Sequence, residues 1–347
     1  TRRGAAAMNG QKVENLLNLA MGSTQREKEK SQNLMTGYNE NERTWELIIR
    51  YDQSRSPLPE ELAEVIPLSF GYGIIRVPER EITKLAALEE VEYIEKPKRL
   101  YFAVNQGRAA SCFTGLPASV ETGRALDGSG TIVAVLDTGV DYFHPDFRRE
   151  DGSTRILALW DQTLDAGMPP EGFRSGTEFT GSQLNAALEA GRRDQAAGYK
   201  IVPSRDTAGH GTQVLGIAAG NGRASGGIYA GGAPGSDILA VKLGTLDPDG
   251  FPGTAQLMQA VEYVLRKAMR YRQPVVINLS FGNVYGSHGG TSLLETYLNN
   301  MAGVWKNVIV AGSGNEGAGR GHAAGNLQED EVQLTEFAIS EYETVLN

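Results

Sequence analysis

The sequence predicts an α/β protein: a doubly wound, mainly parallel and incomplete sheet, preceded by a small α+β domain. From residue 131 onward, short apolar runs alternate with segments of helical period, which is typical of parallel strands covered by helices on both faces. The 43 glycines are concentrated after residue 115, as expected where many tight turns follow strand ends. Residues 44–97 carry a shorter β-α-β-α-β pattern instead.

Composition excludes several classes of protein. The 347 residues are 40% hydrophobic and 22% charged, with a net charge of −9, which argues against a nucleic-acid partner. The single cysteine, Cys112, cannot form an internal disulfide. No apolar run approaches the roughly 18 residues of a membrane span, and the basic start has no apolar stretch of a signal peptide behind it. We therefore expect neither a nucleic-acid nor a membrane partner.

The N-terminal third divides into three parts. Residues 1–43 are polar and mixed in charge, which favours a solvated leader, although a short helix around Val13 to Met21 is an alternative. Residues 44–98 read as a small domain, in which Trp45, Leu47 and Ile49 alternate as a half-buried strand. Residues 99–120 have no consistent period and are interpreted as an exposed linker. Within the small domain we expect further strands at 72–77 and 91–93, and helices at 59–66 and 78–88.

The remainder is predicted to form the parallel sheet. One stretch, residues 148–205, is irregular and is interpreted as a surface insertion with one helix around Ser182–Ala190. The expected strands lie at 131–136, 237–243, 274–279 and 307–311, and the expected helices at 211–219, 254–271 and 292–304.

Two residues 73 positions apart have the strongest chemical signal. Asp137 ends an apolar strand, and His210 lies between two glycines at the start of a helix. Ligands of parallel sheets bind at the carboxyl ends of strands, and a carboxylate that orients an imidazole is two thirds of an acyl-transfer triad. The simpler interpretations are a turn carboxylate and a surface histidine. The hydrolase interpretation requires the two side chains to be in contact.

Asn315 follows the last predicted strand in a glycine-rich turn. A side-chain amide there can donate a hydrogen bond to a developing oxyanion, whereas a left-handed turn asparagine is the alternative. His144, in His-Pro-Asp-Phe, is interpreted as structural, and Asp206 as a cap of its local turn.

Taken together, these motifs resemble the subtilisin-like serine proteases (subtilases, peptidase family S8). The resemblance covers about residues 131–325 in patches. Within the family the chain is most similar to the Csp-type germination proteases of clostridia, which retain their propeptide; it shares with them Glu92-Tyr-Ile-Glu-Lys-Pro-Lys-Arg, Gly286-Ser-His-Gly-Gly-Thr-Ser and His322-Ala-Ala-Gly. The family motifs are Val135-Leu-Asp-Thr-Gly-Val-Asp with His144-Pro-Asp-Phe, Gly209-His-Gly-Thr-Gln-Val, Gly232-Ala-Pro with Ile238-Leu-Ala-Val-Lys, Val276-Ile-Asn-Leu-Ser-Phe-Gly, and Ala311-Gly-Ser-Gly-Asn-Glu-Gly.

The resemblance implies a role for each matching residue. Asp137 would orient the base, His210 would be the general base, and Asn315 the oxyanion donor. Ser280, Phe281 and Gly282 would form the strand that pairs with the substrate backbone.

The resemblance also implies a domain organisation. Residues 44–98 would be a propeptide that occupies the cleft, with self-cleavage within 104–111, near Gln106. Residues 121–325 would be the N-terminal part of the catalytic domain, and 326–347 the start of an insertion. The implied partners are a protein or peptide substrate, the propeptide, and a C-terminal remainder. The implied location is cytoplasmic or spore-associated.

The sequence departs from the family at two positions. Gln213 stands where many relatives have a second histidine. The family's Gly-Thr-Ser nucleophile motif occurs only as Gly290-Thr291-Ser292, before the oxyanion turn. Ser292 fits better as a helix N-cap, with Glu295 completing a capping box. The nucleophile is therefore expected on sequence after residue 347.

No metal or cofactor is expected. The loop Gly220–Gly227 has no carboxylate, whereas Ca²⁺ requires six to eight oxygen ligands. A catalytically silent pseudoprotease that acts as a sensor or scaffold is the main alternative function, and the intact Asp137 and His210 argue against it. A nucleotide-binding enzyme is disfavoured, because no Gly-x-Gly-x-x-Gly follows the first strand and no Walker lysine is present.

Overall fold

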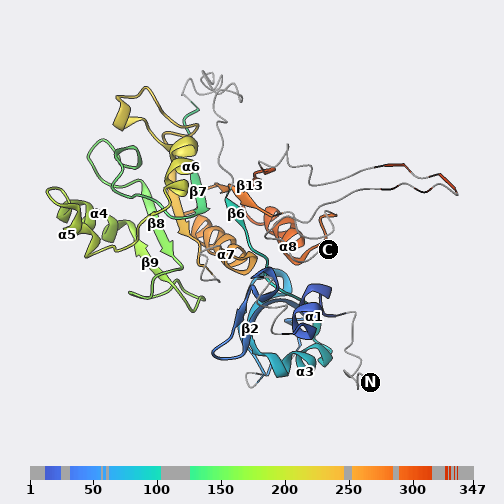
Figure 1. Cartoon of the computed structure of the whole chain (residues 1–347). Coiled ribbons are helices and arrows are strands. Elements are labelled where there is room, and N and C mark those ends of the chain that lie inside the picture. Colours follow the sequence, from blue (N-terminus) through green and yellow to red (C-terminus); the bar gives the residue numbers. More distant parts are fainter. Residues whose placement is uncertain are drawn as a thin grey trace.

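The computed structural model consists of an N-terminal domain and a larger α/β unit (Figure 1). It describes residues 12–24, 32–55, 58–59, 62–102, 126–245, 252–283 and 289–314, and single residues between 325 and 334.

The N-terminal domain is an antiparallel sheet of order β1-β2-β4-β3, with β5 paired to the other part of β2. Trp45, Leu47 and Ile49 are fully buried, as their alternation predicts. Each such apolar side chain contributes about 1.5–3 kcal/mol on burial. Helix α3 packs Ile82 and Leu85 into the same core. The elements are α1 (Asn15–Gly22), β1 (Tyr38–Asn39), β2 (Thr44–Tyr51), β3 (Glu64–Pro67), β4 (Tyr72–Pro78), α3 (Ile82–Ala87) and β5 (Val91–Glu95).

Two expectations for this domain are wrong. The segment expected as a solvated leader contributes Val13, Leu17 and Leu34 to the domain core, because Leu17 and Ala20, three residues apart on α1, share the buried face of the helix. The helix expected at 59–66 is replaced by a turn closed onto Pro59 and by strand β3, whose residues pair with β4. Pro59 and the following glutamates suit a helix start, but Val65 and Ile66 are β-branched and complete the sheet edge.

The α/β unit has a six-stranded sheet of order β13-β11-β7-β10-β8-β9. All neighbouring strands are parallel except β9, which runs antiparallel to β8. Alternate residues of β7 point to opposite faces, so that Ala134 packs on the side of α7 and α8, and Val135 on the side of α4 and α6. The elements are β7 (Ile132–Asp137), β8 (Ile156–Asp161), β9 (Thr177–Thr180), α4 (Gly181–Ala190), α5 (Gln195–Tyr199), α6 (His210–Ala219), β10 (Asp237–Lys242), α7 (Thr254–Tyr271), β11 (Val275–Leu279), α8 (Leu293–Ala302) and β13 (Asn307–Ala311).

The interpretation of residues 148–205 as a surface insertion is wrong. This segment supplies two strands of the main sheet, β8 and β9, and two helices, α4 and α5. Trp160 in β8 is fully buried against Phe173 and Tyr263. The one helix that was expected in this segment, at Ser182–Ala190, is found as α4. The irregular segments around β8 and β9 hid both strands from sequence periodicity.

The N-terminal domain docks on α7 and α8 of the α/β unit (Figure 1). Glu262 of α7 accepts hydrogen bonds from the backbone N–H and hydroxyl of Ser69, at 3.2 and 2.8 Å. The hydroxyl of Tyr72 lies 2.9 Å from that of Thr296 on α8. Glu95 accepts the backbone N–H of Leu293, at the start of α8. Both domains therefore complete each other's hydrogen bonds.

The expected exposed linker 99–120 does not begin as exposed chain. Arg99 and Leu100 are buried, and Leu100 packs into the core shared with α7. Strand β6 (Tyr101–Phe102) then pairs antiparallel with β12 (Phe281–Gly282). These residues stay inside because the α/β unit provides strand partners for them. The remaining linker residues, 103–120, lie outside the described part of the chain.

Candidate active site

Asp137 and His210 meet at the carboxyl end of β7. Nδ1 of His210 lies 2.7 Å from Oδ1 of Asp137. The Asp137 side chain is fully buried, and the His210 side chain is 7% exposed. The contact on which the hydrolase interpretation depends is therefore present, between a strand end and a helix start that are 73 residues apart.

The geometry suits an oriented base. Oδ1 of Asp137 also accepts the backbone N–H of Thr138, at 2.7 Å. Oδ2 of Asp137 is buried and has no hydrogen-bond partner among the described residues. A carboxylate held in this way keeps the proton of His210 on Nδ1 and stabilises an imidazolium. Nε2 then carries the lone pair that can accept a proton from a nucleophile.

Two glycines allow the histidine to approach the carboxylate. Gly209, the residue before α6, has a φ of 77°, which glycine adopts without strain. Gly211 packs directly on the loop after β7: a Cβ built on it would lie 2.3 Å from the carbonyl oxygen of Gly139 and 3.0 Å from Cβ of Asp137. Any larger residue at 211 would push the helix start away from β7.

Asp206 connects the two segments and has a larger role than the local cap expected from the sequence. Its Oδ1 accepts the hydroxyl of Thr138 and the backbone N–H of Gly209, at 2.7 and 2.9 Å. Its Oδ2 accepts both the N–H and the hydroxyl of Thr212. Burial alone would raise the pKa of Asp206, but the hydrogen bonds from Thr212 and Thr138 hold that pKa below its ordinary value. The sequence signal for this role is a threonine close after each site residue: Thr138 directly follows Asp137, and Thr212 lies two residues after His210.

The chain next to β12 already carries an extended backbone partner. Asn283 donates its side-chain N–H to the carbonyl oxygen of Arg99, at 3.1 Å. On the other side, the backbone N–H of Leu100 donates to Pro252, at 2.9 Å. Residues 98–102 thus lie between two chain segments, 252–254 and 281–283. The segment 252–254 gave no signal in the sequence. Ser280, the residue before β12, donates its hydroxyl to the side chain of Asn278.

The other predicted residues separate into described and undescribed ones. His144 caps the short 3₁₀ turn Pro145–Phe147 and stacks near Phe147, so its structural role is confirmed. Ser292 is the N-cap of α8 and forms the capping box with Glu295. Gln213 is exposed on α6. Asn315, the cleavage region 104–111 and most of 326–347 lie outside the described residues.

Neither a metal cluster nor a membrane helix is found in the part of the chain that the structure describes. No three His, Cys, Asp or Glu side chains there are grouped as metal ligands. None of the described helices combines the length and apolar character needed to cross a bilayer.

The fold described above is that of a subtilase. Residues 128–336 match the subtilase family of serine peptidases, and the chain belongs to that family. The domain that precedes it is similar to another known domain: residues 11–98 match the Csp protease B prodomain. The N-terminal domain described above is therefore a prodomain, and it includes most of the segment expected as a leader.

The chain is also similar to individual proteins. A subtilisin of Bacillus sp. strain TA39 is 30% identical over 247 residues, which cover 69% of this chain and 47% of the relative. M-protease of Shouchella clausii strain KSM-K16 is 26% identical over 302 residues, covering 84% and 63%. The solved structure of the Clostridium perfringens CspB protease is 34% identical, covers 55% of this chain and 38% of that chain, and has a TM-score of 0.48. The chain spans about half the length of the subtilisin that it matches.

Proposed function

We propose that the complete protein is a serine endopeptidase in which His210 is the general base and Asp137 orients it. The observation that carries the proposal is the 2.7 Å contact between Nδ1 of His210 and the buried carboxylate of Asp137. In this mechanism Nε2 of His210 accepts the proton of a serine hydroxyl, which attacks the peptide carbonyl, and then returns the proton to the leaving amine.

Asn315 is proposed to donate its side-chain N–H to the oxyanion that forms during this attack. Its place in the sequence, four residues after the end of β13, supports the role, because β13 is parallel to β11 and β11 to β7, so that the carboxyl end of β13 lies at the same edge of the sheet as Asp137. Ser280, Phe281 and Gly282 are proposed to bind the substrate as an added strand. The pairing of β12 with β6 supports this role, since β12 already accepts an extended backbone.

The nucleophile is proposed to lie on sequence after residue 347, in a C-terminal remainder. Ser292, the only serine of the chain in a Gly-Thr-Ser motif, donates its hydroxyl to Glu295 at 2.7 Å and accepts the backbone N–H of the same residue. A serine so engaged at a helix start is not poised to attack a peptide. The exposed Val308 and Val310 on β13 offer an apolar face on which further chain can pack.

The chain is proposed to cleave itself within 104–111, near Gln106, and the prodomain is proposed to stay bound to the catalytic part afterwards. The placement of residues 98–102 beside β12 supports cleavage shortly after this segment.

A variant of the complete protein tests the base. His210→Ala should abolish cleavage within 104–111 and lower peptidase activity by at least about 10³-fold, because triad members act as a unit. Mass spectrometry of the purified protein locates the cleavage, and a fluorogenic peptide reports activity. His144→Asn, which keeps a capping side chain, is the matched control and should retain both. Unimpaired cleavage in His210→Ala would refute the assignment of the base.

A fluorophosphonate probe separates this function from the pseudoprotease alternative. The probe should label a serine in the complete, folded wild-type protein, and labelling should be lost in His210→Ala. Absence of labelling in a folded and cleaved wild-type sample would contradict the peptidase proposal.

A further inference from the structure

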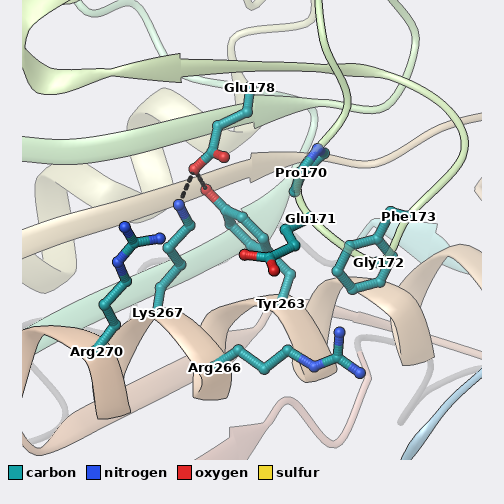
Figure 2. A pocket seen from close by; sticks show the side chains of 9 residues that line it. All are labelled: Pro170, Glu171, Gly172, Phe173, Glu178, Tyr263, Arg266, Lys267 and Arg270. Atoms are coloured by element: carbon teal, nitrogen blue, oxygen red, sulfur yellow. Dashed lines mark hydrogen bonds and ion pairs between the residues drawn. The ribbon is translucent and has the colours of Figure 1, made fainter.

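A second pocket lies apart from Asp137 and His210, between α7 and the loop that connects β8 to β9. Its volume is about 470 Å³, which falls within the roughly 300–1,000 Å³ of small-molecule sites. Figure 2 shows the cationic residues of α7 along one wall, and Phe173 on the loop opposite. None of its lining residues takes part in the proposed peptidase mechanism.

One cation of the pocket is already neutralised. Lys267 forms an ion pair with Glu178 on β9, and the hydroxyl of Tyr263 donates to the same carboxylate oxygen at 2.9 Å. The ring of Tyr263 forms part of the wall (Figure 2). Glu178 is therefore occupied by two donors and does not compensate the remaining charges.

Arg266 is held at the pocket by its inner nitrogen. Its Nε donates to Glu262 at 3.0 Å, and its guanidinium lies 5.4 Å from the centre of the Phe173 ring. Gly172 brings the loop backbone against it: with a φ of +86°, a Cβ at this position would lie 2.7 Å from Nη1. The guanidinium is thus fixed between the ring and the loop, and Nη1 faces the loop side of the pocket.

Arg270 lies one helical turn further along the same wall. It is exposed and makes no hydrogen bond or ion pair with another described residue. Glu171, on the loop, also lines the pocket and is exposed. The pocket therefore combines one guanidinium that has no hydrogen-bond or ion-pair partner among the described residues, a second one in fixed orientation, and an aromatic wall.

We propose that this pocket binds a small organic carboxylate. The carboxylate is held between Arg270 and Arg266, because a guanidinium presents paired N–H groups that match two carboxylate oxygens. The apolar body of the ligand lies against Phe173 and the ring of Tyr263. Glu171 opposes binding by charge repulsion at the pocket mouth. This site is independent of the proposed peptidase chemistry.

Benzoate is the test probe, with benzamide as its neutral counterpart and inorganic phosphate as an anion without an apolar body. Binding to the purified full-length protein is measured by ligand-observed NMR titration. Benzoate should bind at least about tenfold more tightly than benzamide and than phosphate. R270Q should weaken benzoate binding about fivefold or more, and E171Q should tighten it about threefold, in keeping with one exposed ion pair each.

R193Q removes an exposed arginine from the opposite side of the sheet and is the matched control, which should leave benzoate binding unchanged. Because Arg270 and Arg193 are both exposed, both variants should keep the wild-type unfolding temperature without probe. Equal binding of benzoate and benzamide, equal effects of R270Q and R193Q, or phosphate binding as tight as benzoate would each overturn the proposal.

Discussion

Asp206 fixes the distance between the chain segments that carry Asp137 and His210. It accepts four hydrogen bonds: one from the hydroxyl of Thr138, one from the backbone N–H of Gly209, and two from Thr212. Thr138 in turn accepts the backbone N–H of Gly211. The acid and the base are therefore held by a carboxylate that touches neither of their side chains.

The charge of Asp206 gives a pH-dependent contribution to stability. Hydrogen bonds outweigh burial and place its folded-state pKa below the ordinary value of 3.8. A lowered folded-state pKa stabilises the fold above about pH 4, and this contribution is lost as the pH falls through the folded-state pKa. We expect Asp206→Asn to reduce the free energy of unfolding by about 1–3 kcal/mol at pH 7 and by clearly less at pH 3. Urea unfolding at both pH values measures this, and an equal loss at both would contradict it.

Arg155 is a buried cation that joins four parts of the α/β unit. Arg155 is 3% exposed, and its guanidinium donates to the carbonyl oxygens of Asp146, Ala219, Ala233 and Ser236. Burial lowers the pKa of Arg155 to about 10, so it stays charged at neutral pH. It supplies a positive charge next to the loop 220–227, which has no carboxylate to bind a metal ion.

Removal of this guanidinium leaves several buried carbonyl groups without donors. We expect Arg155→Met to lower the free energy of unfolding by roughly 2–5 kcal/mol. Arg155→Lys should recover less than half, because an ammonium group cannot span the same acceptors. Thermal and urea unfolding measure both, with Arg193→Met as an exposed control. A loss no larger than that of the control would show that water replaces the donors.

At the scale of elements, α8 begins with a complete capping box. Ser292 and Glu295 exchange hydrogen bonds, and Glu95 of the prodomain accepts the N–H of Leu293. We expect Ser292→Ala to lower the free energy of unfolding by about 1 kcal/mol and to leave fluorophosphonate labelling of the complete protein unchanged. Loss of labelling in a variant that remains folded would instead make Ser292 the nucleophile.

Elements with a strong apolar period could be predicted from the sequence. The expected helix 254–271 coincides with α7, because buried residues recur along its whole length. Strand β8 is as long as β7 and was missed because irregular segments without a helical period lie on both sides of it. Strand β3 was mistaken for a helix because Pro59 and its acidic neighbours imitate a helix start. Hydrophobic periodicity shows which face of a helix or strand is buried, but it does not show which strand pairs with which in a sheet.

The candidate site was predictable to the same extent. Asp137 ends an apolar strand and His210 lies between two glycines at a helix start, so their pairing could be expected. The hydrogen bonds of Asp206 join residues 68 positions apart, and no local pattern encodes such a contact. The segment 252–254 contacts residues 98–100 through its backbone, and such contacts leave little trace in side-chain identity.

At the scale of the whole molecule, Glu262 is the buried centre of the prodomain interface. It accepts Ser69 twice, the hydroxyl of Tyr297 at 2.8 Å, and Arg266. Its side chain is 3% exposed. Each hydrogen bond that is lost therefore leaves a buried carboxylate oxygen that water cannot reach, which is unfavourable. The interface is thus held by ionic and polar contacts as well as by the apolar core that it shares with α7.

A single change tests this arrangement. In Glu262→Gln the side-chain amide faces donors and can satisfy only part of them. We expect the segment Ser69–Tyr72 to exchange its amide hydrogens about 5–100-fold faster, which corresponds to a loss of about 1–3 kcal/mol. Hydrogen–deuterium exchange on the complete protein measures this. Glu189→Gln, on the exposed face of α4, is the control, and equal exchange in the two variants would contradict a central role for Glu262.

The pairing of β6 with β12 has a consequence for timing. A foreign peptide that is to lie along Phe281 and Gly282 must first displace a strand tethered to the same molecule, whose effective concentration does not fall on dilution. On the proposed function, the onset of peptide turnover therefore depends on how often strand β6 leaves β12, and not on how fast peptides arrive. A newly made molecule is then expected to be inactive until a substrate has replaced residues 101–102 beside β12.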